Sequence, residues 1–201
     1  QTNHWVSEPF KNLTTSIFIN NLTLNISDQK YLNYVVSLAI LDLLSELSID
    51  KLSIKWPNDI MSANKKICGI LIENSIRNHN IYSSIIGIGL NVNQVKFPEY
   101  LKNVTSLKLL KNKVFDLEAL LVKLVKKIKL RAALLSEKKY EQLEDEYLSV
   151  LYKKNVPTMF KDSYNVLFMG KITGISSTGN LLVELEDDSI KEFGIKEISL
   201  A

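Results

Sequence analysis

Cysteine pairs, membrane-spanning runs and a strong charge of one sign are all missing from this chain. Its 201 residues contain one cysteine, Cys68, which excludes an intramolecular disulfide and argues against a cysteine-based zinc site. No apolar run approaches the roughly 20 residues that span a bilayer. Lys and Arg number 25 against 22 Asp and Glu, too small an excess to indicate nucleic-acid binding by itself. We therefore expect a protein of a reducing compartment, the cytoplasm, with no membrane partner.

Glycine is scarce and unevenly spread, and none precedes Gly69. The last four glycines fall between Gly170 and Gly194, where short apolar runs alternate with polar turns. Regular short strands of this kind are typical of a small β-barrel. Because the pattern changes at this point, we expect two domains, an α/β domain at 1–153 and a small all-β domain at 154–201.

Hydrophobic periodicity predicts the elements of both domains. Alternating apolar residues over 12–21 predict a strand, and apolar residues recurring at three and four over 31–47 predict a helix that Ser27 or Asp28 caps. The remaining expectations for the larger domain are strands over 52–56, 66–73 and 81–92, a polar loop over 75–80, and helices over 116–136 and 137–151. In the smaller domain we expect strands over 156–160, 163–175, 180–186 and 189–194.

The expected strand at 81–93 has two different faces. Side chains alternate along a strand, so Gly87, Gly89 and Asn91 share one face and aliphatic residues occupy the other. The aliphatic face suits packing under helices. The glycine face is a bare trough that either admits a ligand or allows close helix packing.

Two further segments carry polar groups at strand ends. Lys55–Asp59 reads Lys-Trp-Pro-Asn-Asp, and its proline bends or ends the strand just before an amide and a carboxylate. An ordinary Asx turn has the same composition. Lys66–Glu73 is apolar between its charged ends, so Lys66 either meets a phosphate or carboxylate or lies in solvent. We expect Cys68 in this strand to be a small buried hydrophobic residue.

Taken in order, Lys55–Asp59 (KWPND), Lys66–Glu73 (KICGILIE) and Ile86–Asn93 (IGIGLNVN) resemble the biotin protein ligase (biotin–[acetyl-CoA-carboxylase] ligase) family. Ser7-Glu8-Pro9 with Lys11-Asn12-Leu13, Phe97-Pro98 and Thr105–Leu107 are also similar to that family. The end of the chain is similar to the SH3-like module of the family. The resemblance implies an α/β (α+β) fold, with a mixed-sheet catalytic domain of the class II synthetase type and a small C-terminal SH3-like β-barrel.

The resemblance also implies an activity. Members of the family join biotin to ATP in the presence of Mg²⁺, forming biotinyl-5′-AMP, and then transfer biotin to a lysine of a biotin carboxyl carrier protein. We therefore expect ATP, biotin and Mg²⁺ as ligands. The expected partner is the carrier subunit of acetyl-CoA carboxylase or of another biotin-dependent carboxylase. A homodimer is compatible with the resemblance, and this sequence predicts no nucleic-acid partner.

The family motifs imply the residues of the site. Lys66 and Asp59 are expected to be catalytic, Lys66 by neutralising carboxylate and phosphate oxygens and Asp59 by orienting Lys66 or the metal shell. The implied biotin-binding residues are Gln1, Lys66, Gly69, Gly87 and Gly89. The implied nucleotide-binding residues are Asn58, Asp59, Asn91 and Trp5. No residue is expected to be a direct metal ligand.

The sequence departs from the family at two points. Gln1 and Thr2 are followed directly by Asn3-His4-Trp5, whereas the family has a glycine- and arginine-rich loop, G-R-G-x-x-G, before the tryptophan. Either this loop is deleted or the chain as given is joined across it, and the well-matched flanks favour the second explanation. Phe10 stands where the family usually has glycine, which places the local turn in question.

Three other functions stay open. Lipoate–protein ligases share the fold and the adenylation chemistry, although the motifs at Lys55–Asp59 and Gly87–Asn91 favour biotin. A biotin-sensing transcriptional regulator would carry a DNA-binding segment before this domain, and the chain, which does not begin with Met, is expected to be part of a longer protein. A binding module that has lost the loop would keep the fold without the chemistry.

Overall fold

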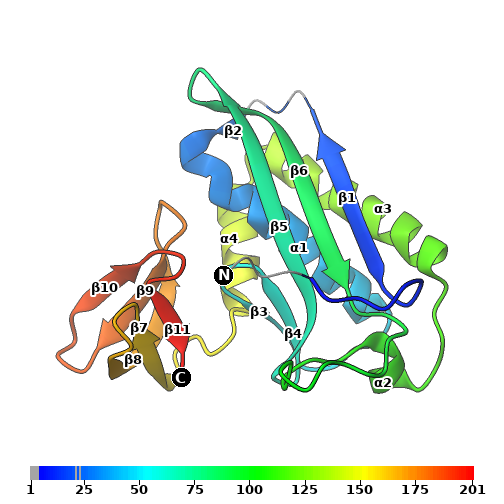
Figure 1. Cartoon of the computed structure of the whole chain (residues 1–201). Helices are drawn as coiled ribbons and strands as arrows, with labels where there is room; N and C mark the ends of the chain where they lie inside the picture. Colours follow the sequence, from blue (N-terminus) through cyan, green and yellow to red (C-terminus); the bar gives the residue numbers. More distant parts are fainter. Residues whose placement is uncertain (1–4, 21, 23) are drawn as a thin grey trace.

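The computed structural model describes residues 5–20, 22 and 24–201. Its larger part is a six-stranded sheet in which β1, β6, β5, β4 and β3 are neighbours in that order, while β2 also pairs with β6 (Figure 1). All of these ladders are antiparallel. The strands are β1 Leu13–Ile19, β2 Leu24–Asn25, β3 Leu52–Lys55, β4 Asp59–Ser62, β5 Lys65–Arg77 and β6 Asn80–Leu90.

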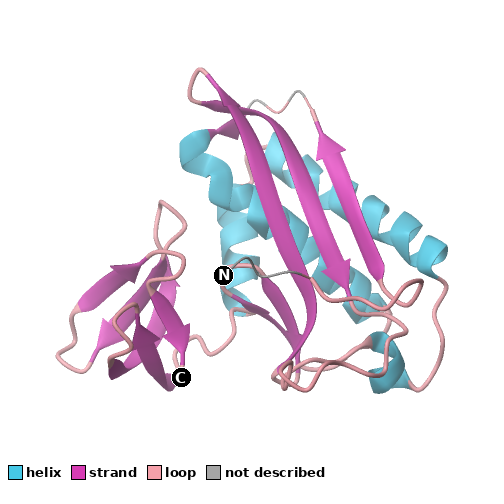
Figure 2. Cartoon of the chain, in the orientation of Figure 1, coloured by secondary structure: helices cyan, strands magenta, loops and turns pink. Residues whose placement is uncertain are grey.

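Helices cover one face of this sheet (Figure 2). α1 packs on β3, β4 and β5, and α3 and α4 pack against α1. Val36, Ala39 and Leu43 of α1 are each 0% exposed, because this helix lies between the sheet and the other two helices. No helix in the described part of the chain is long and apolar enough to cross a membrane. The helices are the 3-10 helix Ile26–Asp28, α1 Gln29–Glu46, α2 Leu107–Lys111, α3 Leu117–Ser136 and α4 Tyr140–Ser149.

The hairpin of β5 and β6 corrects one prediction. The sequence predicts a polar loop over 75–80, but the two strands continue through this region and leave a turn of Asn78 and His79. Across the hairpin, Ser84 donates a hydrogen bond from Oγ to Asn74 Oδ1 (2.7 Å). Residues 75–80 are all exposed, because the end of the hairpin extends past the helices (Figure 1).

The helix N-termini follow the sequence in one case and not in the other. Asp116 caps α3 as predicted, since its carboxylate accepts hydrogen bonds from the backbone N–H groups of Glu118 and Ala119 (2.9 and 3.0 Å). Asp28 is the N-cap of α1 but makes no capping bond with its side chain. The chain enters α1 through the 3-10 helix instead, which Asn25 caps.

The two faces of β6 differ as the sequence predicts. Ile86, Ile88 and Leu90 are 0%, 2% and 1% exposed in the core, and burying an aliphatic side chain of this size contributes about 1.5–3 kcal/mol. Gly87 and Gly89 lie on the opposite face, away from this core. Because β6 runs between β1 and β5, the two glycines lie in the interior of the sheet rather than at its edge.

A second, five-stranded sheet follows α4, with its strands in the order β10, β9, β8, β7 and β11. All of its ladders are antiparallel. The strands predicted after residue 155 are present, and β11 is one that the sequence analysis missed. They are β7 Pro157–Asp162, β8 Leu167–Ile175, β9 Leu181–Leu185, β10 Ile190–Phe193 and β11 Ile198–Leu200.

The segment between the two sheets is bound to the edge of the first. Ile54 in β3 donates a backbone hydrogen bond to Val150 (2.9 Å) and accepts one from Tyr152 (2.8 Å). Trp56 then links the sheets directly, because its Nε1–H donates to the carbonyl of Gly179 in the β8–β9 turn (3.0 Å). Among the described residues parallel pairing is confined to isolated bridges, so the sheet expected to be mixed is antiparallel. The α/β (α+β) class predicted from the sequence is confirmed.

Candidate active site

One row of residues crosses the open face of the larger sheet. Asp59 in β4 stands opposite Gly69 in β5, which stands opposite Gly89 in β6. The row continues to Lys55 in β3 at one end and to Thr14 in β1 at the other. Directly opposite residues of neighbouring strands share a face. Strand pairing therefore brings together three predicted site residues that are far apart in the sequence.

A β-bulge in β5 turns Lys66 toward this row. The residue opposite Ile60 is Cys68, but the residue opposite the next position, Met61, is Lys66. One step along β4 therefore corresponds to two residues of β5. In a regular strand Lys66 and Gly69 would lie on opposite faces, because three positions separate them. Here Lys66 Nζ lies 3.2 Å from the point that a Cβ on Gly69 would occupy. Backbone hydrogen bonds from Lys66 N to Asn103 O (2.8 Å) and from Thr105 N to Lys66 O (2.9 Å) hold the bulge in place.

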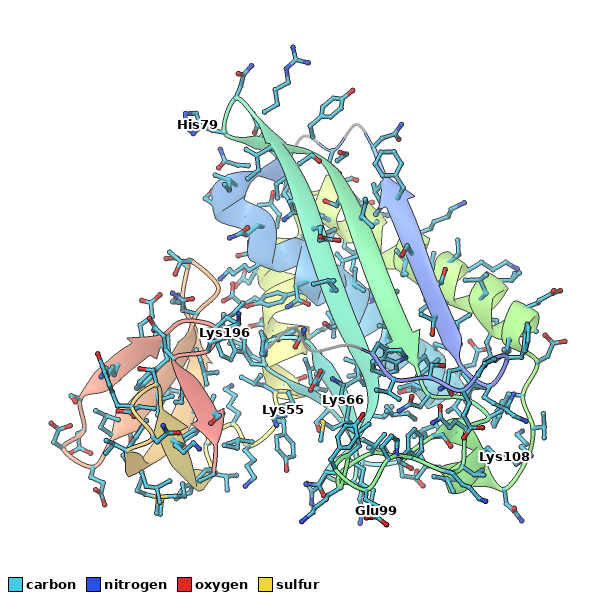
Figure 3. All side chains as sticks on the ribbon, in the orientation of Figure 1. Lys55, Lys66, His79, Glu99, Lys108 and Lys196 are labelled. Carbon is cyan, nitrogen blue, oxygen red and sulfur yellow. The ribbon has the colours of Figure 1, made fainter. Side chains whose placement is uncertain are left out.

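Lys66 and Asp59 form an ion pair at the end of the glycine row. Lys66 Nζ lies 2.6 Å from Asp59 Oδ1, and the two side chains are 33% and 23% exposed, so a ligand can reach both. An exposed pair of this kind contributes little to stability. Lys66 can therefore turn from Asp59 to an anionic ligand at small cost. Figure 3 places Lys66 at the lower end of β5.

The indole of Trp5 lies across the two glycines of the row. A Cβ on Gly89 would lie 2.4 Å from Trp5 Cε2, and a Cβ on Gly69 would lie 3.1 Å from Trp5 Cζ3. Only residues without a side chain allow this contact. Lys66 Nζ lies 5.6 Å from the ring centroid, within range of a cation–π interaction. The Nε1–H of Trp5 is buried and meets no acceptor among the described residues, so a donor is available at the glycine row.

The next part of the same face is apolar around Gly87. This glycine stands opposite Leu71 in β5 and Ser16 in β1, and the nearest atoms to a Cβ built there are 3.6 Å away. Phe18 and Ile85 form the following pair. Leu71, Phe18 and Ile85 are 60%, 64% and 46% exposed. Exposed apolar side chains around bare backbone offer a surface for a flat, largely apolar ring.

The two predicted nucleotide-binding amides are both engaged within the protein. The side chain of Asn58 donates from Nδ2 to the Ile70 carbonyl (2.8 Å), and its backbone carbonyl accepts from Ile70 N (2.9 Å). These two bonds hold the turn before Asp59 against β5. Asn91 donates from Nδ2 to the Thr105 carbonyl (3.0 Å). Its Oδ1 is buried without a donor from the described part of the chain, and the residue is 2% exposed. Asn91 thus keeps an acceptor that no described group uses.

Three other sequence-based expectations concern single positions. Gln1, a predicted biotin contact, lies outside the described residues. Cys68 is 0% exposed as expected, and burial raises the pKa of its thiol, which disfavours the nucleophilic thiolate. Phe10 has a φ of 59°, in the left-handed region that favours glycine, so the chain makes a glycine-type turn there. Within residues 5–20, 22 and 24–201, no group of three or more metal-ligating side chains occurs.

Sequence reasoning missed two features of the site. The first is the bulge, whose one signal is the spacing of three between Lys66 and Gly69 within a single strand. The second is the contact of Trp56 with Gly179, which ties the segment Lys55–Asp59 to the second sheet. No local pattern pairs these two residues, because they lie in turns that belong to different sheets.

Comparisons with known proteins find similar sequences over most of the chain. Residues 1–91 match the biotin/lipoate A/B protein ligase family. The chain is similar to the bifunctional ligase/repressor BirA of Bacillus spizizenii, with 34% identity over 155 residues that cover 72% of this chain and 43% of the relative. BirA of Salmonella typhimurium is 33% identical over 177 residues, covering 84% of this chain and 52% of the relative. The chain thus spans about half the length of these curated relatives.

A solved structure is similar over nearly the whole chain. It is the biotin protein ligase from Aquifex aeolicus in complex with biotin and ATP, which covers 95% of this chain with a TM-score of 0.75 and 28% identity. This chain covers 78% of that protein. The structural similarity to this ligase therefore extends beyond residues 1–91, where the family match ends.

Proposed function

We propose that this chain, whose residues 1–91 match the biotin/lipoate A/B protein ligase family, is an ATP-dependent biotin–[acetyl-CoA-carboxylase] ligase. The similarity to a ligase that binds biotin and ATP supports both ligands. The observation that carries the proposal is the Lys66–Asp59 ion pair at the end of the glycine row. Beside Gly69 and Gly89, on which the indole of Trp5 lies, Gly87 offers bare backbone to a fused ring, and Lys66 offers a cation to the reacting oxygens.

The first proposed step is adenylation. An oxygen of the biotin carboxylate forms a bond to the α-phosphorus of ATP, and the bond from that phosphorus to the oxygen of the β-phosphate breaks. Pyrophosphate leaves with the electron pair, and biotinyl-5′-AMP remains. Lys66 would hold the carboxylate and an α-phosphate oxygen together, because its charge offsets their mutual repulsion. Asp59, 2.6 Å from the Lys66 ammonium, orients that side chain.

The second proposed step transfers biotin to a biotin carboxyl carrier protein. The neutral ε-amine of a carrier lysine attacks the acyl carbon of biotinyl-5′-AMP. The bond from that carbon to the phosphate oxygen breaks, AMP leaves with the electron pair, and the surplus proton of the amine passes to solvent. The open face of the sheet, on which no described helix lies, suits the approach of a second protein.

We assign the ligand contacts as follows. Gly69, Gly87 and Gly89 would form the floor for biotin, with Lys66 at its carboxylate and Gln1 as a further contact. Trp5, Asn58, Asp59 and Asn91 would serve the nucleotide. The unused Oδ1 of Asn91 suits the exocyclic amine of adenine, whereas Asn58 would act by holding the turn that carries Asp59.

Mg²⁺ fits the site only together with the nucleotide. The donor set beside Lys66 contains one carboxylate, Asp59, and the described residues hold no cluster of three metal ligands. Magnesium sites of one or two carboxylates plus substrate phosphates are common. Asp59 would be the protein group nearest to such an ion, which would supply charge neutralisation on the phosphates.

We further propose a division into a catalytic domain at 1–153 and an SH3-like domain at 154–201, which the separation into two sheets supports. A ligase that consumes ATP and modifies a carboxylase subunit would work in the cytoplasm. The single, buried Cys68 accords with that reducing compartment.

ATP–pyrophosphate exchange by the full-length protein tests the proposed function. Biotin, lipoate and octanoate are supplied separately, and exchange with biotin alone is the expected result. Exchange with lipoate or octanoate alone would assign the chain to the lipoate branch of the family. Absence of exchange with all three would contradict adenylation and leave a binding module.

A second candidate, a biotin-dependent repressor, is favoured by the relatives named as bifunctional ligase and repressor. A gel-shift measurement with promoter DNA and the full-length protein tests this role. Retarded DNA that depends on biotin and ATP would support it.

A further inference from the structure

The segment Trp5–Asn12 carries the indole that lies on the glycine row, yet it belongs to no strand or helix. Its residues from Val6 to Lys11 are all exposed, so it buries little surface of its own. In its described backbone, Lys11 N donates to Glu8 O (3.3 Å) within a turn, and Lys11 O accepts from Asn93 N (2.7 Å) at the sheet. A segment with few backbone bonds and little buried surface opens easily unless side chains hold it.

Two buried amides hold this segment against the chain that leaves β6. Asn12 and Gln94 are 8% and 2% exposed. Gln94 Oε1 accepts hydrogen bonds from Asn12 Nδ2 (2.5 Å) and from the backbone N–H of Glu8 (3.1 Å). The remaining bonds of the two amides run from Asn12 Nδ2 to Ser7 Oγ (3.1 Å), from Val92 N to Asn12 Oδ1 (2.9 Å) and from Gln94 Nε2 to Lys96 O (2.8 Å). Every polar atom of the two side chains is thus engaged, as the burial of an amide requires.

The amide pair ties the indole to the strand on which it lies. Gly89 is in β6, and Val92, which donates to the Asn12 side chain, follows it by three residues. The indole of Trp5 is in direct contact with this strand, because a Cβ added to Gly89 would overlap it. Movement of the segment would therefore shift the indole against the strand and against Lys66, whose Nζ lies 5.6 Å from the ring centroid.

We propose that Asn12 and Gln94 are positioning residues of the site, which hold Trp5 on Gly69 and Gly89 and so preform the surface that receives the nucleotide. The inference rests on the proposed function, since that function supplies the nucleotide and assigns Trp5 to it. A segment that is already held in its binding conformation binds more tightly, because it is not ordered at the expense of the binding free energy. The two amides act on the reaction through Trp5.

Fluorescence of Trp5 tests this positioning without any ligand. This chain of 201 residues contains two tryptophans, so Trp56→Phe leaves Trp5 as its single reporter. In that background, Gln94→Leu removes the acceptor used by Glu8 N and Asn12 Nδ2 and keeps a side chain of similar size. We expect the emission of Trp5 to shift to longer wavelength and its quenching by acrylamide to rise several-fold, because the released indole leaves the glycine row for water.

Asn93→Leu is the matched control. Asn93 is also a buried amide in the chain that leaves β6, and it is 9% exposed. Among the described residues its side chain bonds only Phe115, accepting from Phe115 N (2.9 Å) and donating to Phe115 O (2.8 Å). The loss of a buried amide should lower the Tm of both variants. Trp5 should be released in Gln94→Leu alone, because the Asn93 side chain does not bond the segment Trp5–Asn12.

The KM for ATP distinguishes positioning from a general loss of stability. With biotin saturating, Gln94→Leu should raise the KM for ATP in pyrophosphate exchange roughly tenfold, the effect of having to order one or two side chains during binding. Asn93→Leu should keep the wild-type KM. Thermal unfolding of each variant confirms that it is folded at the temperature of the assay.

The outcomes separate the positioning role from the enzyme activity. Wild-type Trp5 fluorescence in folded Gln94→Leu would overturn the inference, and biotin-dependent exchange by the same protein would leave the proposed function intact. Equal fluorescence changes in Gln94→Leu and Asn93→Leu would also overturn it, because both would then report lost stability. A change confined to Gln94→Leu supports the hold on Trp5 even if the wild type shows no exchange, in which case the proposed function alone fails.

Discussion

Lys66 and Gly69 lie three positions apart in one strand, yet the Lys66 ammonium reaches to within 3.2 Å of the place where a Gly69 Cβ would stand. The bulge in β5 makes this possible, because the extra residue reverses the alternation of side chains between the two positions. A cation and a bare stretch of backbone consequently face the same ligand.

Replacing Lys66 tests the role of that cation. Lys66→Ala is expected to lower biotin-dependent ATP–pyrophosphate exchange by roughly 10²- to 10³-fold, the range for removing one preorganised electrostatic group. The free energy of unfolding should change little, since the side chain is partly exposed. Lys65→Ala, at the exposed neighbouring position, is the control and should keep the wild-type rate. An unchanged rate in Lys66→Ala would refute the assignment.

A methyl group on Gly89 tests the contact with Trp5. Gly89→Ala places a Cβ 2.4 Å from Trp5 Cε2, so the indole must leave the glycine row. We expect exchange to fall roughly 10²-fold, because a displacement of about 1 Å in a site has that effect. Fluorescence in a Trp56→Phe background reports the movement of Trp5. Gly174→Ala, where a Cβ meets nothing within 4 Å, should change neither signal.

The hydrogen bond from Trp56 to Gly179 predicts how firmly the sheets are joined. Trp56→Phe removes the donor and leaves a carbonyl with one partner fewer, which should reduce stability by about 1 kcal/mol. We expect faster proteolysis and faster amide exchange in the segment 150–156, which connects the sheets. Tyr164→Phe, on a side chain that is 85% exposed in the turn between β7 and β8, is the control. If the segment 150–156 were equally protected from proteolysis and amide exchange in Trp56→Phe and Tyr164→Phe, contacts other than this hydrogen bond would hold the sheets together.

Phe10 predicts a stabilising substitution. Its φ of 59° is unfavourable for a residue with a Cβ, and its side chain is 94% exposed. Phe10→Gly should raise the free energy of unfolding by about 0.5–1 kcal/mol, because the relief of backbone strain exceeds the added entropy of the unfolded chain. Urea denaturation measures the change. A less stable variant would show that Phe10 makes contacts that offset its strain.

Glu46 predicts a pH dependence at the α1–α3 contact. Hydrogen bonds from Lys123 and Lys127 lower the pKa of Glu46 from 4.5 to about 2. A carboxyl with a lowered pKa in the folded state adds stability above pH 4.5 and loses it as the pH falls through about 2. Between pH 4.5 and about 2, the Tm of Glu46→Gln should fall less steeply with falling pH than the Tm of the wild type. High salt should reduce this difference between the two proteins, because the ion pair is exposed. Glu99→Gln, at an exposed position, should follow the wild type.

Much of the fold could be predicted from local patterns. The alternation over 12–21 and the helical spacing over 31–47 were sufficient for β1 and α1, and Asp116 was sufficient for the start of α3. The polar stretch 75–80 was wrongly predicted as a loop, because a strand segment exposed on both faces has the composition of a loop.

The sequence by itself determined which residue types carry the chemistry, since the motifs at 55–59, 66–73 and 86–93 are short and their residues are neighbours in the chain. Only the tertiary structure decided how these motifs meet. The row from Lys55 to Gly89 depends on the pairing register of four strands, and the reach of Lys66 depends on one extra residue in β5. The contact of Trp56 with Gly179 depends on the docking of two sheets. Register and docking arise from hydrogen bonds and packing between residues distant in sequence, and no local periodicity records them.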